Sequence, residues 1–436
     1  MVYTFKRGTH PDGNKEHTKD KSIEVLKAPE YVVLPVSMHI GAPAKVIVKP
    51  GDTVKLGQMV AEAGGFVSAP VHATVSGTVT KVEPRLHPNG TKVMSVVIEN
   101  DFNDEWHESV KPFDYENMTQ DELCDALAKS GIVGHGGAAF PTHVKVKSGI
   151  GKIDTIIING AECEPYITSD HRLLLERPEE IIAGIEILIK IFGVRNAKLA
   201  IEKNKSNTFE RIEELIAHND AIELCPLEVK YPQGAEKQLI YAVTHREVPT
   251  KKLPADAGCA VFNVDTCGAI YRYFALGQPM YRRIVTVSGS AVSNPKNLEV
   301  RIGTPITNLI EQCGGFVRDP YKLLMGGPMM GVSQFTTDIP VFKGTNAFLA
   351  FDKSGALPDP GQCIRCGRCV DVCPMNLIPT YLYHMNEKNN LDGLVGYNTM
   401  DCIECGACTY ICPAKLPLVQ GIRAGKHKIQ ASQPKK

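Results

Sequence analysis

The chain carries the stretch Cys363-Ile-Arg-Cys366-Gly-Arg-Cys369-Val-Asp-Val-Cys373-Pro374, and it repeats this spacing in Cys402-Ile-Glu-Cys405-Gly-Ala-Cys408-Thr-Tyr-Ile-Cys412-Pro413. Both stretches read C-x2-C-x2-C-x3-C-P. In this pattern three thiolates surround one [4Fe–4S] cube, and the fourth thiolate belongs to a second cube. Two copies therefore predict a pair of [4Fe–4S] clusters, with one-electron transfer as their chemistry.

The spacing also predicts which cysteines share a cluster, because the last cysteine of each stretch is exchanged. One expected ligand set is Cys363, Cys366, Cys369 and Cys412, and the other is Cys402, Cys405, Cys408 and Cys373. The segment between the stretches is rich in helix formers. Since it is also too long for the hairpin of a minimal bacterial ferredoxin, we expect a helical ferredoxin module.

Zinc and disulfides are the alternatives for these cysteines. A single C-x-x-C leaves both open, but a tetrahedral zinc site has no use for the third cysteine spacing or the terminal proline. The polar segment 1–21 lacks the apolar run of a secretion signal, which argues against a disulfide framework. Iron–sulfur ligation therefore remains the favoured interpretation.

The composition is that of a globular protein with more than one domain. The chain has 436 residues, of which 43% are hydrophobic and 22% charged, enough for two to four domains. Its formal net charge of zero argues against a nucleic-acid partner. No uncharged apolar run reaches the roughly 18 residues of a membrane-spanning helix. The most apolar run, 181–192, contains Glu186 and Lys190 and predicts a buried amphipathic helix.

Residues 31–99 predict a small β-domain. Short alternating strands are separated by turn residues such as those of Lys49-Pro-Gly-Asp52. The segments 50–54 and 73–79 resemble the flattened barrel, or barrel-sandwich, of biotinyl and lipoyl carrier domains. The stretch 63–67, where a carrier has its lysine, contains none. We therefore expect a barrel that serves as structure or as a docking surface.

The next region alternates between helices and strands. Thr119 and Glu122 form a capping box that predicts a helix over 121–130. An apolar strand is expected over 154–159, and a helix with Pro178 near its start follows. This alternation predicts an α/β layer with a mostly parallel sheet, of Rossmann-like type.

Three polar stretches of this region are candidates for ligand binding. The first is 134–142, whose glycines allow a phosphate or a flavin ring to approach the backbone, although a plain glycine turn fits as well. The second, 159–165, follows an apolar strand, where open α/β sheets bind ligands. Its alternative is a helix N-cap with solvated acids. The third is 233–237, with 262–266 beyond it.

Taken together, these stretches resemble the flavin-bearing, NADH-binding subunit of respiratory complex I. The shared words are Gly136-Gly-Ala-Ala-Phe140-Pro-Thr142, Asn159-Gly-Ala-Glu162-Cys-Glu-Pro165, Gly234-Ala-Glu236 and Asn263-Val-Asp-Thr266. With the barrel, a β-grasp region and the paired cysteine stretches, the whole chain resembles the RnfC family, whose members belong to the Rnf electron-transport complex. That complex is a ferredoxin:NAD oxidoreductase that couples electron flow to Na+ or H+ export.

The resemblance implies FMN and NAD(H) as cofactors beside the two [4Fe–4S] clusters, and it implies roles for single residues. The implied cofactor-binding residues are Gly136, Gly137, Lys145, Asn159, Glu162, Gly234, Glu236, Asn263 and Thr266. Among them, Glu162 is expected to tune the nicotinamide, while Asn263 and Thr266 are expected at the FMN phosphate. The chain departs from complex I at His135, Ala161 and Phe262, where complex I has arginine, an acid and asparagine. No side chain is expected to act as a catalytic acid or base.

The resemblance also implies a place in the cell. We expect a peripheral protein on the cytoplasmic face of the membrane, with the other subunits of an Rnf-type complex as partners and ferredoxin as an indirect one. Two alternatives remain open at this point. One is a soluble flavin/iron–sulfur reductase of the cobalamin reductase type, and the other is an electron-wire subunit without flavin.

Five segments follow from these patterns. We expect an N-terminal extension with the barrel-sandwich domain over 1–110, an FMN/NADH-binding α/β domain over 111–275 and a β-grasp domain of the SLBB type over 276–352. A helical ferredoxin domain is expected over 353–425. The basic, Gln- and Ser-containing tail 426–436 is expected to be disordered.

Overall fold

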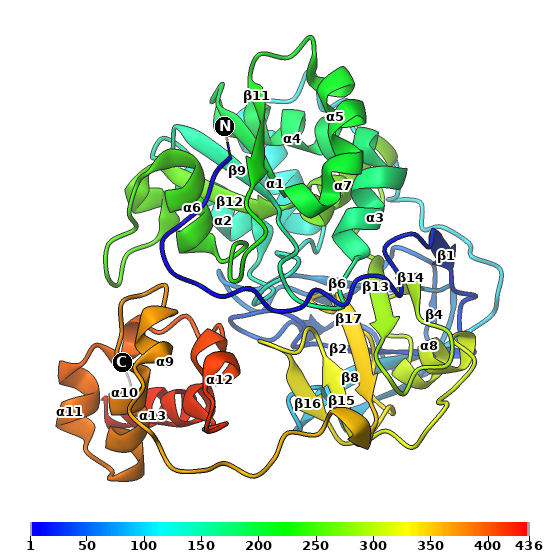
Figure 1. Ribbon diagram of the computed structural model, residues 1–436. Helices are drawn as coiled ribbons and strands as arrows, with labels where there is room; N and C mark the ends of the chain where they lie inside the picture. Colours follow the sequence, from blue (N-terminus) through cyan, green and yellow to red (C-terminus); the bar gives the residue numbers. More distant parts are fainter. Residues whose placement is uncertain (1, 434–436) are drawn as a thin grey trace.

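The computed structural model describes residues 2–433. Figure 1 shows an α/β layer (cyan to green), two β-rich parts beside it, and a helical module (orange to red) on a long connection. This architecture confirms the multidomain α/β and α+β class expected from the sequence.

The α/β layer is built on a four-stranded parallel sheet. Its order is β11 (Ile222–Leu227), β10 (Ala197–Glu202), β9 (Thr155–Gly160) and β12 (Cys259–Asn263). Both faces of the sheet are buried, because Ile156 and Ile158 enter one core while Ile157 enters another. The apolar segment 154–159 therefore forms a central strand, as predicted.

Helices cover both faces of this sheet (Figure 1). They are α1 (Gln120–Lys129), α2 (Thr142–Gly149), α3 (Ser169–Glu176), α4 (Pro178–Phe192), α5 (Phe209–Ile216), α6 (Glu236–Thr244) and α7 (Val264–Leu276), with short turns η1 (Lys203–Thr208) and η2 (Pro254–Ala257). The predicted capping box is present, since the Thr119 side chain accepts from the Glu122 N–H and Glu122 from the Thr119 N–H. Helix α4 begins at Pro178 and ends before the left-handed Gly193 (φ 66°).

The barrel-sandwich consists of two small antiparallel sheets. One has the order β2 (Tyr31–Pro35), β8 (Lys92–Asn100), β7 (Gly77–Leu86) and β4 (Thr53–Val54), and the other has the order β3 (Lys45–Val46), β5 (Met59–Glu62) and β6 (Val71–His72). Gly77 must be glycine, since a Cβ there would lie 1.9 Å from the Glu99 carbonyl oxygen and its φ is +148°. Valines such as Val32, Val60 and Val79 fill the space between the sheets.

A six-stranded mixed sheet forms the third part. Its order is β1 (Ile23–Val25), β14 (Lys296–Arg301), β13 (Arg282–Ser288), β17 (Ala347–Phe351), β15 (Lys322–Met325) and β16 (Val332–Gln334), and α8 (Ile306–Gln312) packs on it. Strand β1 comes from the N-terminal segment and pairs in parallel with β14. The expectation that residues 1–110 form one unit with the barrel is therefore wrong for the first residues.

Polar contacts explain why the N-terminal segment leaves the barrel. Lys15 donates from Nζ to the carbonyl oxygens of Glu162 and Glu164 at 2.9 and 3.0 Å. The Asn297 side chain donates to the Thr18 carbonyl at 2.9 Å, and Leu26 enters the core of the six-stranded sheet. Such long-range partners leave no periodic signal in the sequence.

The module that carries both cysteine stretches is helical, as predicted. It contains α9 (Arg368–Asp371), α10 (Pro379–Glu387), α11 (Leu391–Gly396), α12 (Ala407–Ile411) and α13 (Leu418–Ser432), with η4 (Thr399–Asp401) between them and η3 (Lys353–Gly355) on the connection before it. No described helix is long and apolar enough to cross a membrane.

The prediction of a disordered tail over 426–436 is wrong as far as Ser432, where α13 ends. Ile429 is buried in the module, and Lys428 donates to the Asn386 carbonyl at 3.0 Å. The basic residues thus lie on the polar side of an amphipathic helix whose apolar side is covered. Residues 434–436 of the predicted tail lie outside the described residues.

Candidate functional site

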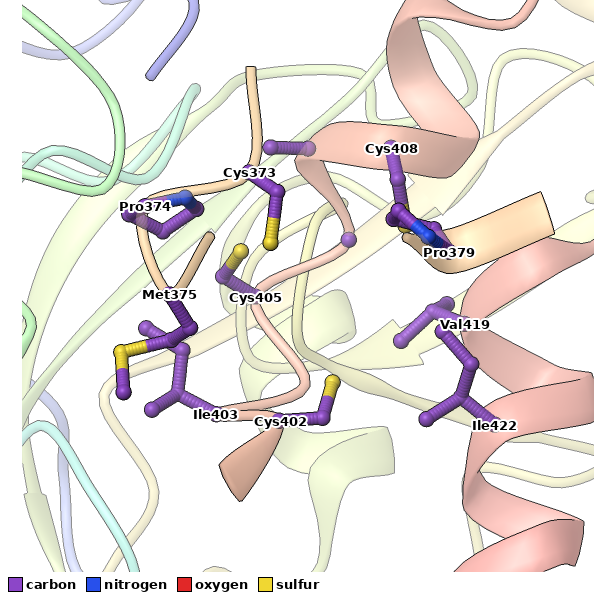
Figure 2. A pocket seen from close by; sticks show the side chains of 12 residues that line it. Cys373, Pro374, Met375, Pro379, Cys402, Ile403, Cys405, Cys408, Val419 and Ile422 are labelled. Atoms are coloured by element: carbon purple, nitrogen blue, oxygen red, sulfur yellow. The ribbon is translucent and has the colours of Figure 1, made fainter. Parts of the chain in front are cut away.

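Four cysteines line one pocket inside the helical module, which we call the inner cysteine pocket. They are Cys373, Cys402, Cys405 and Cys408. Figure 2 shows the sulfur atoms of Cys373 and Cys405 turned toward each other across this pocket. The other lining residues are apolar, among them Met375, Ile403 and Ile422.

A second pocket, the outer cysteine pocket, is lined by Cys363, Cys366, Cys369 and Cys412. Cys366 is exposed to solvent, whereas the inner cysteines are buried or half-buried. Each pocket combines three cysteines of one stretch with the last cysteine of the other. The fold therefore brings together the two sets that the spacing predicts, while their binding of iron remains a prediction.

The local backbone explains how each stretch turns its thiols inward. Gly367 precedes α9 and Gly406 precedes α12, and both have a φ of 78°, a left-handed conformation that suits glycine. Backbone N–H groups also point at sulfur, as from Leu377 to Cys373 Sγ at 3.4 Å. Such donors stabilise a charged thiolate cluster.

Burial raises the pKa of the Cys402 thiol to about 11 and that of the Cys405 thiol to about 12. Without a metal centre these thiols would stay protonated at neutral pH. A centre that binds thiolates must therefore displace their protons. The apolar wall, the sulfur-directed N–H groups and the four convergent cysteines fit a [4Fe–4S] cluster in the inner pocket.

The glycine-rich stretch 134–142 lies at the carboxyl ends of β9 and β12. A Cβ at Gly136 would lie 3.3 Å from Asn263 Nδ2, and one at Gly137 would meet no protein atom within 4 Å. Both glycines are exposed, so their backbone faces open space. Thr266 Oγ1 accepts from the His135 N–H at 3.1 Å and so fixes the stretch to α7.

Two more pairs of the predicted residues are in contact at this edge. Asn159 Nδ2 donates to the Gly234 carbonyl at 2.9 Å, and a Cβ at Gly234 would lie 3.3 Å from the Asn159 side chain. Lys145 Nζ lies 3.1 Å from Glu236 Oε1 and donates to the Val261 carbonyl at 2.8 Å. The edge therefore combines an open glycine backbone with amide, ammonium and carboxylate groups, which suits a polar ring system and its phosphates.

Glu162 has a different surrounding from the exposed acid that a turn would give. Its carboxylate accepts from the backbone N–H groups of Asp170 at 2.6 Å and His171 at 3.3 Å, at the start of α3. Its φ of 46° places it in the left-handed region. The side chain thus caps a helix, which fixes its position at the end of β9.

A buried charged cluster under the glycine-rich stretch has no counterpart in the sequence expectations. Asp265 pairs with Arg272 at 3.3 Å, with Arg283 of β13 and with His135 at 3.1 Å. Burial lowers the pKa of His135 to about 4, so this ring is neutral at pH 7. Asp265 lay in a quoted stretch, but nothing in the sequence pairs it with an arginine of another domain.

Comparisons with known proteins agree with this arrangement domain by domain. Residues 3–103 match the RnfC barrel sandwich hybrid domain, 127–272 the Nuo51 FMN-binding domain, 284–333 the SLBB domain and 362–416 the 4Fe-4S dicluster domain. A chain of NAD+-reducing [NiFe]-hydrogenase has a similar fold, with a TM-score of 0.50 at 18% identity over 73% of this chain and 64% of that one. The fold and site define a flavin- and iron–sulfur-type electron-transfer protein.

Relatives along the full length identify the family, and all three compared here are RnfC-type subunits. The chain is 49% identical to the one from the Na(+)-translocating ferredoxin:NAD(+) oxidoreductase complex of Acetobacterium woodii, over 99% of the chain and 98% of the relative. It is 43% identical to the one from the proton-translocating complex of Clostridium ljungdahlii, over 99% and 95%. It is 42% identical to the one from the ion-translocating oxidoreductase complex of Rhodobacter capsulatus, over 100% and 85%.

The chain belongs to the RnfC family, one of the subunit families of the ion-translocating ferredoxin:NAD oxidoreductases. This confirms the resemblance seen in the sequence, including the FMN-binding and dicluster domains. The alternative of a cobalamin-reductase-type protein is not favoured, because these relatives match nearly the whole chain, including the barrel.

Proposed function

We propose that this protein exchanges hydride with NAD(H) at an FMN held by the α/β domain and passes single electrons through the two cysteine pockets. When bound, FMN converts the two-electron chemistry of NAD(H) into the one-electron steps that iron–sulfur clusters carry. The observation that carries the proposal is the pairing of crossed cysteine sets in two pockets of one module.

The residues at the flavin edge would bind and orient rather than react. Gly136 and Gly137 offer backbone without a side chain to the ring, and Asn159 and Asn263 offer amide groups beside it. Thr266 and the start of α7 suit the phosphate, since N–H groups at a helix start attract anions. Helix capping holds the Glu162 carboxylate at the end of β9, where we place the nicotinamide side of the site.

The cysteines would hold the clusters in the sets described above. Of the two pockets, the inner one lies next to the α/β domain, because the Tyr231 hydroxyl donates to the Cys405 carbonyl at 2.7 Å. The outer one contains the exposed Cys366. We therefore propose the order FMN, inner cluster, outer cluster, with the partner subunits of the complex beyond the outer pocket.

The location follows from the family as a proposal of its own. The relatives are named as subunits of ion-translocating complexes. We propose that the chain attaches to the cytoplasmic face of the membrane through the other subunits and reaches ferredoxin through them. Extraction of native membranes in mild detergent should co-purify the chain with integral subunits. Recovery of the chain free of them after gentle extraction would contradict this attachment.

Cofactor analysis of the anaerobically purified chain tests the central proposal. We expect about one FMN and about eight iron and eight sulfide per chain, with NADH-dependent reduction of a one-electron dye. Iron without flavin would favour the electron-wire alternative. A single zinc without iron would overturn the cluster proposal.

A further inference from the structure

The α/β domain touches the inner cysteine pocket through two buried side chains, Tyr231 and Glu164. Tyr231 is 1% exposed, and its hydroxyl lies 2.7 Å from the Cys405 carbonyl oxygen and 3.4 Å from Glu164 Oε1. A phenol has one proton to donate. The shorter contact therefore identifies the Cys405 carbonyl as its acceptor, with Glu164 beside it.

Glu164 holds a second element against the same pocket. Its carboxylate accepts from the N–H groups of Met329 at 3.0 Å and Met330 at 2.9 Å. A Cβ at Gly327 would lie 2.1 Å from Glu164 Oε2, and a Cβ at Gly406 would lie 2.7 Å from the Met329 carbonyl oxygen. Glu164 thus grips the segment 327–331, and this segment packs on the residue that follows Cys405.

The contacts converge on one peptide group. The carbonyl of Cys405 and the N–H of Gly406 belong to the same peptide unit. A donor on the carbonyl polarises the unit and strengthens its N–H as a donor. In cluster-binding loops, hydrogen bonds to the sulfur atoms set the reduction potential. A tyrosine from another domain therefore acts on the electronic surroundings of the inner pocket.

We propose that Tyr231, oriented by Glu164, is a positioning residue that raises the reduction potential of the inner cluster and couples it to the flavin domain. This inference rests on the proposed ligation of the cluster by Cys373, Cys402, Cys405 and Cys408. Neither Tyr231 nor Glu164 is among the cluster or flavin residues predicted from the sequence. Burial also raises the pKa of Glu164 to about 7, which marks a carboxyl group held away from water.

The test is a redox titration of the purified chain followed by electron paramagnetic resonance. Tyr231→Phe keeps the ring and its packing but removes the donor to the Cys405 carbonyl. We expect unchanged flavin and iron contents and a lower midpoint potential for the inner cluster alone. The equilibrium for its reduction should fall threefold to tenfold, where tenfold equals 59 mV for one electron. Flavin-to-cluster electron transfer in stopped flow should slow, while the outer cluster keeps its potential.

Tyr273→Phe is the matched control, because Tyr273 is a buried tyrosine of α7 that packs against Phe113 and Phe274. It should leave both potentials unchanged. Glu164→Gln provides a second variant, since it keeps the size of the side chain but offers only one oxygen to Met329 and Met330. It should lower the inner potential in the same direction.

The outcomes separate this inference from the proposed function. Wild-type chain without iron would refute the clusters themselves. Intact clusters with equal inner potentials in wild type, Tyr231→Phe and Glu164→Gln would overturn the role of Tyr231. If Tyr231→Phe fails to assemble the inner cluster, the potential measured in Glu164→Gln decides.

Discussion

At the scale of single residues, the exchanged cysteines Cys373 and Cys412 carry the clearest consequence of the fold. Each lies in the pocket of the other stretch, although the nearest cysteines in sequence belong to its own. The structural reason is that α9 and α12 pack together after equivalent left-handed glycines, which brings the ends of the two stretches face to face.

Replacing Cys412 with serine should therefore remove the outer cluster, not the inner one. We expect iron to fall from about eight to about four per chain, with loss of the outer paramagnetic signal. Iron assay and paramagnetic resonance of the reduced chain measure this. Cys313→Ser, a buried cysteine of the six-stranded sheet core, is the control and should keep all iron. Loss of the inner signal alone would contradict the crossed sets.

Gly137→Val should empty the flavin edge without unfolding the domain. A Cβ at Gly137 meets no protein atom within 4 Å and its φ is not positive, so the new side chain fills only the space offered to a ligand. We expect flavin per chain to fall more than about tenfold with iron unchanged, measured by absorbance after heat release. Gly355→Val, at an equally open glycine on the connection, should retain flavin. Full flavin occupancy in Gly137→Val would move the site elsewhere.

At the scale of elements, α13 shows how tertiary contacts decide whether a basic segment is ordered. Its last turns carry several cationic side chains, yet Ile429 is 3% exposed and anchors them. Lys426 donates to the Cys402 carbonyl at 3.0 Å, which ties this helix to the inner cysteine pocket. The helix thus supports the cluster loop rather than trailing from it.

Ile429→Ala should destabilise the module by about 2–4 kcal/mol, because it leaves a cavity in its small core. The expected result is faster release of iron to a chelator and a lower melting temperature. Val395→Ala in α11 removes a side chain that is 56% exposed and should change neither. Equal iron release from both variants would show that the end of α13 does not support the cluster loop.

At the scale of the whole molecule, one buried lysine joins three domains. Lys343, beside the six-stranded sheet, donates from Nζ to the Pro70 carbonyl of the barrel at 2.6 Å and to the Gly131 carbonyl of the α/β domain at 2.7 Å. Burial lowers the pKa of Lys343 from 10.5 to about 7. The folded protein therefore binds this proton less tightly than the unfolded chain does.

The sign of the pH effect follows from that difference. Between pH 7 and 10.5 the unfolded chain holds a proton that the folded chain has lost, so this lysine makes stability rise with pH and fall as pH drops toward 7. Lys343→Met should remove up to about 1.4 kcal/mol per pH unit of that rise. Melting temperatures between pH 7 and 8.5 measure it, with the exposed Lys322→Met as control. A wild-type slope retained in Lys343→Met would refute the assignment.

Much of the fold is legible in the sequence because its causes are local. The capping box of Thr119 and Glu122 and the end of α4 at Gly193 depend on neighbouring residues. The strand pairing of Ile23–Val25 with β14 and the contact of Arg283 with Asp265 depend on residues far apart in the chain. For the same reason the sequence did not predict that Glu162 caps α3.

By itself, the sequence determined the chemistry and the membership of each cysteine pocket, because ligand spacing within a short loop sets which thiolates can surround one cube. It also determined the order of the domains. Only the tertiary structure decided which pocket meets the flavin domain. That choice depends on Tyr231 and Cys405, which are 174 residues apart, and on the packing of Gly406 against Met329. No local pattern encodes such a contact, since it exists only once three separate domains have packed together.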